Sequence, residues 1–208
     1  QAITYSMNIV AVRCLTETVT PELGYDYAID FGFNTLYEEK EINGKIFTDI
    51  TPSLALGGLT DGVTNLQLTG AYATIANQGV YNKPIFYTKI LDHEGNVLID
   101  NSEPESHRVL KESTAYLLTD AMKDSTEYHN MNGLFSSTST AAALKNMVAA
   151  GKSGTSTGKT DLWFVGYTPY YTCSVWTGYD NSIGMSTAEG NDESAVSKTL
   201  WKAIMQRV

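Results

Sequence analysis

The densest group of reactive side-chain types lies at residues 151–156, which read Gly-Lys-Ser-Gly-Thr-Ser. A lysine ammonium supplies positive charge, threonine and serine hydroxyls donate hydrogen bonds, and glycine lets a backbone approach closely. This combination suits recognition of a carboxylate, and a backbone N–H of the same stretch can face an oxyanion. Taken alone, the stretch is better explained as a polar turn between two strands.

A second candidate is Ser6-Met7-Asn8, which places a hydroxyl and a carboxamide close together at the entrance of an expected helix. Serine and asparagine also cap helices routinely, so this tripeptide is weak evidence by itself. A rival motif is Gly158-Lys159-Thr160, which resembles the end of a phosphate-binding loop. That loop requires glycine at position 153, where this chain has Ser153, and it must lead into a helix. Because a strand is expected at 161–167, a nucleotide-hydrolysing function is disfavoured.

The composition narrows the class of protein further. The 208 residues carry a formal net charge of −9 and contain no cluster of basic residues, so we expect no nucleic-acid partner. Cys14 and Cys173 are too few for a disulfide framework and are expected to be buried free thiols, although a bridge between them stays open. The three histidines are scattered, so we expect no metal site and no cofactor. No apolar run is long enough to span a membrane.

The periodicity of apolar residues predicts an α+β fold, with an antiparallel sheet flanked by helices and a mainly helical lobe. Residues 1–147 form the helical and loop part, and 148–208 supply the strands and a last helix, all within one domain at 1–208. Strands are expected at 148–152, 161–167 and 171–179, with a small hairpin at 85–99 and a loop region at 34–58. Short turns between the three strands predict antiparallel pairing. Helices are expected at 6–19, 20–32, 64–77, 110–124 and 194–208, the last with Val196, Leu200, Ile204 and Val208 on its apolar face.

The two candidate motifs, in this order, resemble a known set. Active-site-serine penicillin-recognising enzymes carry Ser-x-x-Lys, then Ser-x-Asn, then Lys-[Thr/Ser]-Gly. Ser6-Met7-Asn8 matches the second motif and Lys152-Ser153-Gly154 the third. The neighbouring stretches resemble the bifunctional, class A penicillin-binding proteins: ITYSMNIVAVR around the second motif, LALGGLTDGVTNLQLTGAYATIANQGVY between the motifs, and AAGKSGTSTGKTDLWFVGYTPYYTCSVWTGYDN from the third motif onward. The resemblance covers nearly the whole chain and implies the penicillin-recognising transpeptidase fold, present here in part.

The resemblance also implies a reaction, in which a serine is acylated by the D-Ala-D-Ala end of a peptidoglycan stem peptide and beta-lactams imitate that donor. Ser6 and Lys152 would relay a proton, and Asn8 would hold the amide oxygen of the donor. Thr155 and Ser156 would hold the terminal carboxylate, and the Thr155 N–H would form half of an oxyanion hole. Ser153 stands where many members have threonine, and Gly154 would be needed for steric reasons. In such proteins the parent chain is anchored at the extracytoplasmic face of the bacterial cell membrane.

The first motif is the one departure from the pattern. The only Ser-x-x-Lys match, Ser156-Thr157-Gly158-Lys159, lies inside the third motif and is treated as a coincidence. We therefore expect the nucleophile, and two strands of the family's sheet, to lie upstream of Gln1. Part of the sheet would then be unpaired, or filled by a separate or swapped chain, and the fragment alone would be inactive. Two alternatives stay open: a non-catalytic penicillin-binding or sensor module, and a relative of the serine beta-lactamases.

Overall fold

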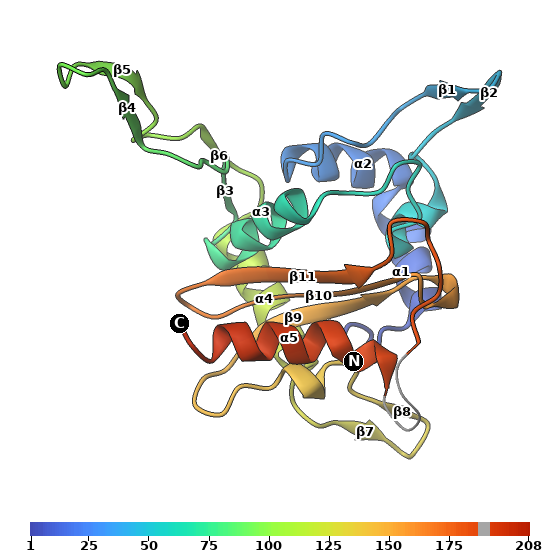
Figure 1. The fold of residues 1–208 in the computed structure, drawn as a ribbon. Helices are drawn as coiled ribbons and strands as arrows, with labels where there is room; N and C mark the ends of the chain where they lie inside the picture. The colour runs from blue at the N-terminus through green and yellow to red at the C-terminus, as the bar shows by residue number, and fades with distance from the viewer. Residues whose placement is uncertain (187–191) are drawn as a thin grey trace.

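The computed structural model describes residues 1–186 and 192–208. Its centre is a small antiparallel sheet with helices on both faces, which confirms the predicted fold class (Figure 1). Two helices of the N-terminal part pack on one face of the sheet, and the C-terminal helix packs on the other. The helices are α1 (Asn8–Cys14), α2 (Pro21–Asp30), α3 (Asn65–Ala76), α4 (Glu112–Lys123) and α5 (Val196–Met205). None of the described helices combines the length and the apolar character that crossing a membrane requires.

The sheet has the strand order β11-β10-β9, and all three strands are antiparallel. β9 (Ala150–Thr155) carries the lysine motif, β10 (Asp161–Tyr167) lies in the middle, and β11 (Thr172–Gly178) follows after a short turn. The apolar run at 161–167 places apolar residues on both faces of β10 and predicts that both faces are covered, and the structure confirms this. Phe164 and Leu162 are fully buried, and Val165 is 2% exposed. Since the sheet is held between two helical layers, β9 is a rigid platform for its polar residues.

Two hydrophobic clusters fix the sheet between the layers. One lies under α3 and α4 and comprises Ile75, Ala115, Met122, Ala150 and Tyr167. The other lies under α5 and comprises Ala142, Ala149, Phe164, Trp201 and Met205. In the second cluster the rings of Phe164 and Trp201 meet edge to face, with centroids 5.0 Å apart. Such contacts add to the free energy gained by burying apolar area.

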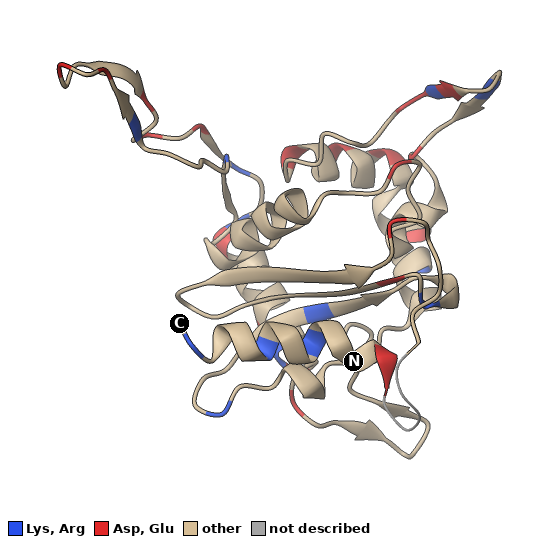
Figure 2. Cartoon of the chain, viewed as in Figure 1, with Lys and Arg blue, Asp and Glu red and all other residues tan. Residues whose placement is uncertain are grey.

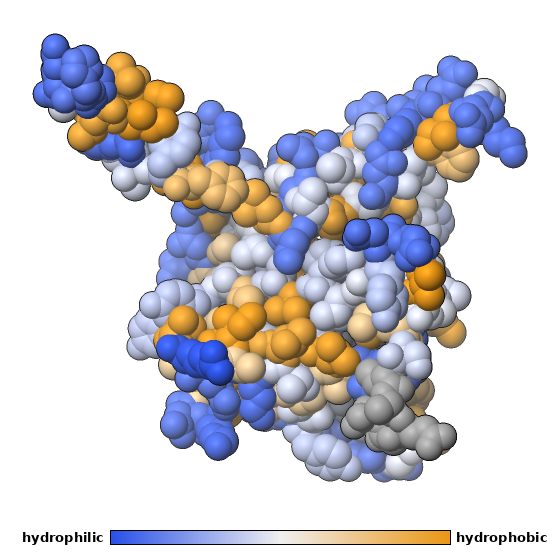
Figure 3. All heavy atoms as spheres, in the orientation of Figure 1, coloured by the Kyte–Doolittle hydropathy of each residue, from blue (hydrophilic) through white to orange (hydrophobic). Residues whose placement is uncertain are grey.

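The predicted inward face of α5 was wrong. Leu200 and Ile204 are each 47% exposed and Val208 is 64% exposed, whereas Trp201 and Met205 are buried against the sheet. Both sets of residues recur every four positions, and the two faces are separated by one residue, which is about 100° around a helix. The set with tryptophan is buried because its ring removes more apolar area from water. Figure 3 accordingly shows apolar side chains gathered on the outer surface over α5.

The helix ends follow their local sequence. α3 begins with a complete capping box, in which Gln67 N donates to Thr64 Oγ1 and Thr64 N donates to Gln67 Oε1. α2 begins at Pro21 after Thr20, whose hydroxyl accepts from Leu23 N. Both starts were expected from these residue types. The predicted helix at 6–19 is divided into α1 and one π-helical turn, Leu15–Val19.

The expectation of a loop at 34–58 was wrong in part, because residues 40–47 form a hairpin of β1 (Lys40–Ile42) and β2 (Lys45–Phe47). Asn43-Gly44 makes its turn with positive φ at both residues, which is a strong hairpin signal that the sequence analysis overlooked. The predicted hairpin at 85–99 is confirmed as β4 (Lys89–Leu91) and β5 (Val97–Asp100). Two short pairs were not predicted: β3 (Val80–Asn82) with β6 (Ser106–Arg108), and β7 (Asn130–Met131) with β8 (Phe135–Ser136).

Candidate active site

Ser6 lies in a tight turn directly before α1. Its N–H donates to Ile3 O at 3.2 Å, and the N–H of Met7 donates to Ala2 O at 2.9 Å. The backbone of Ser6 is left-handed, with φ of 52°. A serine in this conformation costs free energy, and such strain is concentrated at functional sites. The turn leaves the Ser6 side chain exposed beside β9.

The structure brings the two sequence motifs together through Lys152. Lys152 Nζ donates to Ser6 Oγ at 2.8 Å and to the carbonyl oxygen of Ser153 at 2.7 Å. Burial, with a smaller contribution from the positive charge of Lys198, lowers the pKa of Lys152 to about 8. No carboxylate forms an ion pair with Lys152 among the residues that the structure describes. Lys152 therefore exchanges a proton with its surroundings far more readily than a surface lysine.

One edge of β9 faces the helical part rather than another strand. Ser156 N–H donates to Asp161 O on the β10 side, and the direction of N–H groups alternates along a strand, so the Thr155 N–H points to the open edge. Toward the start of β9 this edge is occupied, because the carbonyl of Gly151 accepts from Ser125 Oγ at 2.6 Å. The same turn after α4 binds the carbonyl of Ala149 through Thr126 Oγ1 at 3.0 Å. The end of β9 stays available for a ligand.

The remaining predicted residues divide into two groups. The side chains of Asn8 and Thr155 are exposed and make no hydrogen bond within the described part of the chain. Gly154 lies against Trp163, since a Cβ at this position would come within 3.3 Å of Trp163 Cβ. Ser156 differs, because its hydroxyl is bound within the turn that leads to β10, at 2.7 Å from Thr160 Oγ1 and at 2.8 Å from the N–H of Asp161, which donates to it.

Two adjoining cavities open at this site. The larger has a volume of about 890 Å³ and reaches from Lys152 toward apolar side chains of α1, including Val10 and Ala11. The smaller has a volume of about 520 Å³ and lies between β9, residues 136–141 and the start of α5. Both cavities are lined by the same four predicted residues, Ser6, Asn8, Ser153 and Thr155. The motifs therefore meet at a concave surface, where a peptide or a drug-sized molecule fits.

Sequence analysis missed two contributions to this site. Ser125 and Thr126 fix the edge of β9, and no local pattern of residues indicates that hydroxyls after a helix bind carbonyls 23 or 26 residues away. Lys198 of α5 lines the smaller cavity and is 7% exposed. A lysine at an inward position of an amphipathic helix can indicate a functional residue. Because the inward face of α5 was predicted wrongly, Lys198 was not recognised as inward.

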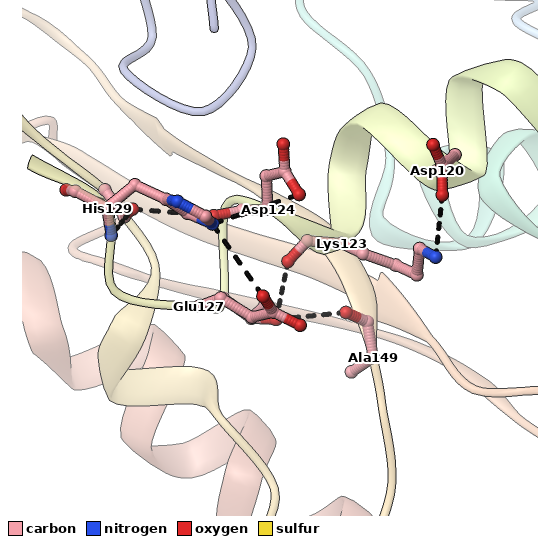
Figure 4. Close-up of polar contacts among 8 residues, drawn as sticks. Asp120, Lys123, Asp124, Glu127, His129 and Ala149 are labelled. Atoms are coloured by element: carbon pink, nitrogen blue, oxygen red, sulfur yellow. Dashed lines mark hydrogen bonds and ion pairs between the residues drawn. The ribbon is translucent and has the colours of Figure 1, made fainter. Parts of the chain in front are cut away.

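A group of potential metal ligands lies apart from the two cavities, in the turn after α4. Ligand atoms of Asp124, Glu127 and His129 lie within 4.8 Å of one another (Figure 4). His129 Nε2 is 3.9 Å from Asp124 Oδ1 and 3.8 Å from Glu127 Oε2. All three side chains are at least 41% exposed, as such surface groups commonly are.

The rival phosphate-binding motif has a structural explanation. Residues 157–159 form one 3-10 turn, and strand β10 follows instead of a helix. Lys159 Nζ forms an ion pair with Glu193 at 2.8 Å. Residues 156–159, which match the Ser-x-x-Lys pattern, therefore lie in a short turn between two strands. This position agrees with treating that match as a coincidence.

Comparison with known proteins gives one family. The model of the penicillin binding protein transpeptidase domain matches residues 1–206. Penicillin-binding protein 1A of Clostridium botulinum is 32% identical over 206 residues, which cover 99% of this chain and 22% of that protein. Penicillin-binding protein 1F of Bacillus subtilis is 35% identical over 190 residues, which cover 87% of this chain and 23% of that protein. The chain thus spans less than a quarter of the length of these relatives.

Solved structures agree with this result. The penicillin-binding protein PonA1 of Mycobacterium tuberculosis superposes with a TM-score of 0.76 at 26% identity, over 99% of this chain and 54% of that one. The same protein in complex with penicillin V gives a TM-score of 0.75. The fold, the two motifs and the matching relatives lead to one conclusion: the chain belongs to the penicillin-binding protein transpeptidase domains, of the type found in class A penicillin-binding proteins.

Proposed function

We propose that these residues are part of a D,D-transpeptidase that cross-links peptidoglycan stem peptides by serine acyl transfer. The observation that carries this proposal is the hydrogen bond of 2.8 Å between Lys152 Nζ and Ser6 Oγ. It forms a direct path for a proton between the Ser-x-Asn and Lys-Ser-Gly motifs. The lowered pKa of Lys152 supports the same role, since an efficient proton carrier titrates near the working pH.

The reaction proceeds in two acyl transfers. A serine hydroxyl attacks the carbonyl carbon between the two D-alanines, and the peptide C–N bond breaks. The proton of that hydroxyl passes by way of Lys152 and Ser6 to the leaving amine of the terminal D-Ala. An amine of a second stem peptide then attacks the ester, a new amide forms, and the serine recovers its proton.

The other residues position the donor. The Asn8 carboxamide holds the amide oxygen of the donor, and the Thr155 N–H at the open edge of β9 supports the oxyanion. The Thr155 hydroxyl binds the terminal carboxylate. Ser156 assists at the same carboxylate and, through its bonds to Thr160 and Asp161, fixes the turn that presents Thr155. Ser153 and Gly154 shape the wall of the site.

The nucleophile comes from a Ser-x-x-Lys segment that precedes Ser6 in the order of the family's motifs. The larger cavity supports this, because it joins Lys152 to Val10 of α1, whose apolar side chain is 45% exposed. The neighbouring Ile9 is 76% exposed. Among the described strands, β11 pairs only with β10, so its second edge can take further strands. These elements belong to the same domain, contributed by the same chain or by a swapped copy, on the extracytoplasmic face of the cell membrane.

Intact mass spectrometry with a penicillin tests the function. In a protein that joins these residues to the upstream segment, incubation should add one drug mass that persists for minutes or longer. The matched control is penicillin hydrolysed beforehand, which cannot acylate a serine. If the longer protein shows no adduct, it is not an acyl-transfer enzyme, and a non-catalytic binding module becomes the better assignment. An adduct that is lost within seconds would instead indicate a beta-lactamase.

A further inference from the structure

The smaller cavity has a chemical character of its own. Eight of its 13 lining residues are serine or threonine, and they come from the Ser6 turn, β9, residues 136–140 and Ser194. The larger cavity, by contrast, includes a wall of alanine, valine, leucine and methionine side chains. A surface rich in hydroxyl groups can surround an oxygen-bearing ligand with hydrogen bonds. We name it the hydroxyl cavity.

Lys198 places a positive charge in the wall of the hydroxyl cavity. Lys198 is 7% exposed. Its ammonium donates to Thr138 O at 2.9 Å and makes a longer contact of 3.5 Å with Ser194 Oγ. Among the described residues no carboxylate oxygen lies within 4.0 Å of this ammonium. Asp192, at the rim of the same cavity, attracts Lys198 only from a greater distance, and it uses its own oxygens to bind Ser194.

This position is unfavourable for a lysine in three respects. Burial removes hydration from the ammonium, and no described carboxylate compensates for this loss at short range, so burial lowers the pKa of Lys198. Lys198 is also the third residue of α5, where the helix dipole disfavours positive charge. Figure 2 shows that the basic segment of β9 lies beside basic segments of α5, although the chain as a whole is acidic. An anion in the hydroxyl cavity would relieve all three unfavourable interactions at once.

We infer that Lys198 and the hydroxyl cavity form a second anion subsite, which binds a carboxylate of the peptide donor other than its terminal carboxylate. The terminal group is held by Thr155 and Ser156 at the end of β9, whereas Lys198 is fixed to the carbonyl of Thr138. Asn8, Ser6 and Ser153 lie in both cavities, so one extended peptide can reach both positions. The inference rests on the proposed function and specifies its substrate as a peptide with two carboxylates.

Calorimetric binding to two matched peptides tests this subsite in the longer protein. Both peptides end in D-Ala-D-Ala, and the preceding residue carries either a free side-chain carboxylate or the corresponding amide. The unmodified protein should bind the carboxylate peptide about tenfold more tightly, the effect of one charge-assisted hydrogen bond. Lys198→Met should abolish this preference, and Lys198→Arg should keep most of it because arginine retains the charge.

Two outcomes would overturn the subsite: equal affinity of the unmodified protein for both peptides, or a preference that survives in Lys198→Met. Methionine is close to lysine in shape and removes the buried charge, so this variant should unfold at the same temperature as the unmodified protein, or higher. Penicillin acylation separates the inference from the proposed function. If the longer protein is not acylated but still prefers the carboxylate peptide, the subsite is present without the proposed reaction. If it is acylated but shows no such preference, the reaction is present without the subsite.

Discussion

Lys152 Nζ lies 2.8 Å from Ser6 Oγ, although the two residues are 146 positions apart in the chain. The contact joins a strained turn before α1 to an edge strand that is packed between two helical layers. Neither partner can move far, because Ser6 is fixed by backbone bonds to residues 2–3 and Lys152 by the pairing of β9 with β10. The proton path of the proposed reaction is therefore assembled before any substrate binds.

Replacing Lys152 should disable acylation without unfolding the domain. Lys152→Met removes the proton carrier, and we expect the rate of penicillin acylation to fall by about 100-fold or more, the range of general acid–base catalysis. Lys159→Met is the matched control, since Lys159 lies seven residues away, is exposed and pairs with Glu193. Stopped-flow acylation of the longer protein measures both. Equal losses in the two variants would show that charge near the site, rather than the position of Lys152, matters.

The pKa of Lys152, about 8 against an ordinary value of 10.5, predicts how acylation depends on pH. A neutral lysine accepts the proton of the nucleophile, so the rate should rise with pH and level off above about 8. Removing the positive charge of Lys198 raises the pKa of Lys152, so Lys198→Met should move this rise to higher pH. Lys152→Arg should remove the rise, since arginine stays protonated. A rise that is identical in Lys198→Met and the unmodified protein would contradict the coupling.

The same shift has a consequence for stability. Between pH 8 and 10.5 the folded chain binds fewer protons at Lys152 than the unfolded chain does. The contribution of this group to the free energy of unfolding therefore rises with pH across that window and is constant below it. Urea unfolding from pH 7.5 to 10 should show a steeper rise for the unmodified protein than for Lys152→Met. Parallel curves would mean that Lys152 titrates at its ordinary pKa.

Ser125→Ala tests whether the turn after α4 holds the edge of β9. The hydroxyl of Ser125 is fully buried and donates to Gly151 O at 2.6 Å, so alanine leaves a buried carbonyl without a partner. We expect the free energy of unfolding to fall by about 1–3 kcal/mol. Ser113→Ala, on the exposed face of α4, should change it by less than about 0.5 kcal/mol. Equal values in urea unfolding would mean that β9 is positioned by its pairing with β10 alone.

The parts of the fold that follow from local chemistry were predictable. Thr64 and Gln67 mark the start of α3 by themselves, and the apolar run at 161–167 predicts a strand covered on both faces. The parts that depend on tertiary contacts were not predictable from the residues alone. Nothing near Ser125 indicates that its hydroxyl binds β9, and nothing near Ser156 indicates that its hydroxyl is used within its own turn. The approach of Ser6 to Lys152 was inferred from the family resemblance, since spacing in the sequence contains no information on this distance.

The inward face of α5, which was predicted wrongly from its aliphatic residues, can be tested by comparing the neighbouring residues Leu200 and Trp201. Trp201 is fully buried, contacts Phe164 and donates from Nε1 to Cys173 O at 3.0 Å, whereas Leu200 is 47% exposed. Trp201→Ala should therefore lower the free energy of unfolding by about 3–5 kcal/mol, because it opens a cavity beneath the sheet. Leu200→Ala should cost less than about 1 kcal/mol, since the side chain is half in water already and alanine favours a helix. Urea unfolding of both variants measures these losses and shows which face of α5 packs on the sheet. If Leu200→Ala were the more costly change, the helix would be turned as its aliphatic spacing suggested, and Lys198 would then be directed away from the hydroxyl cavity.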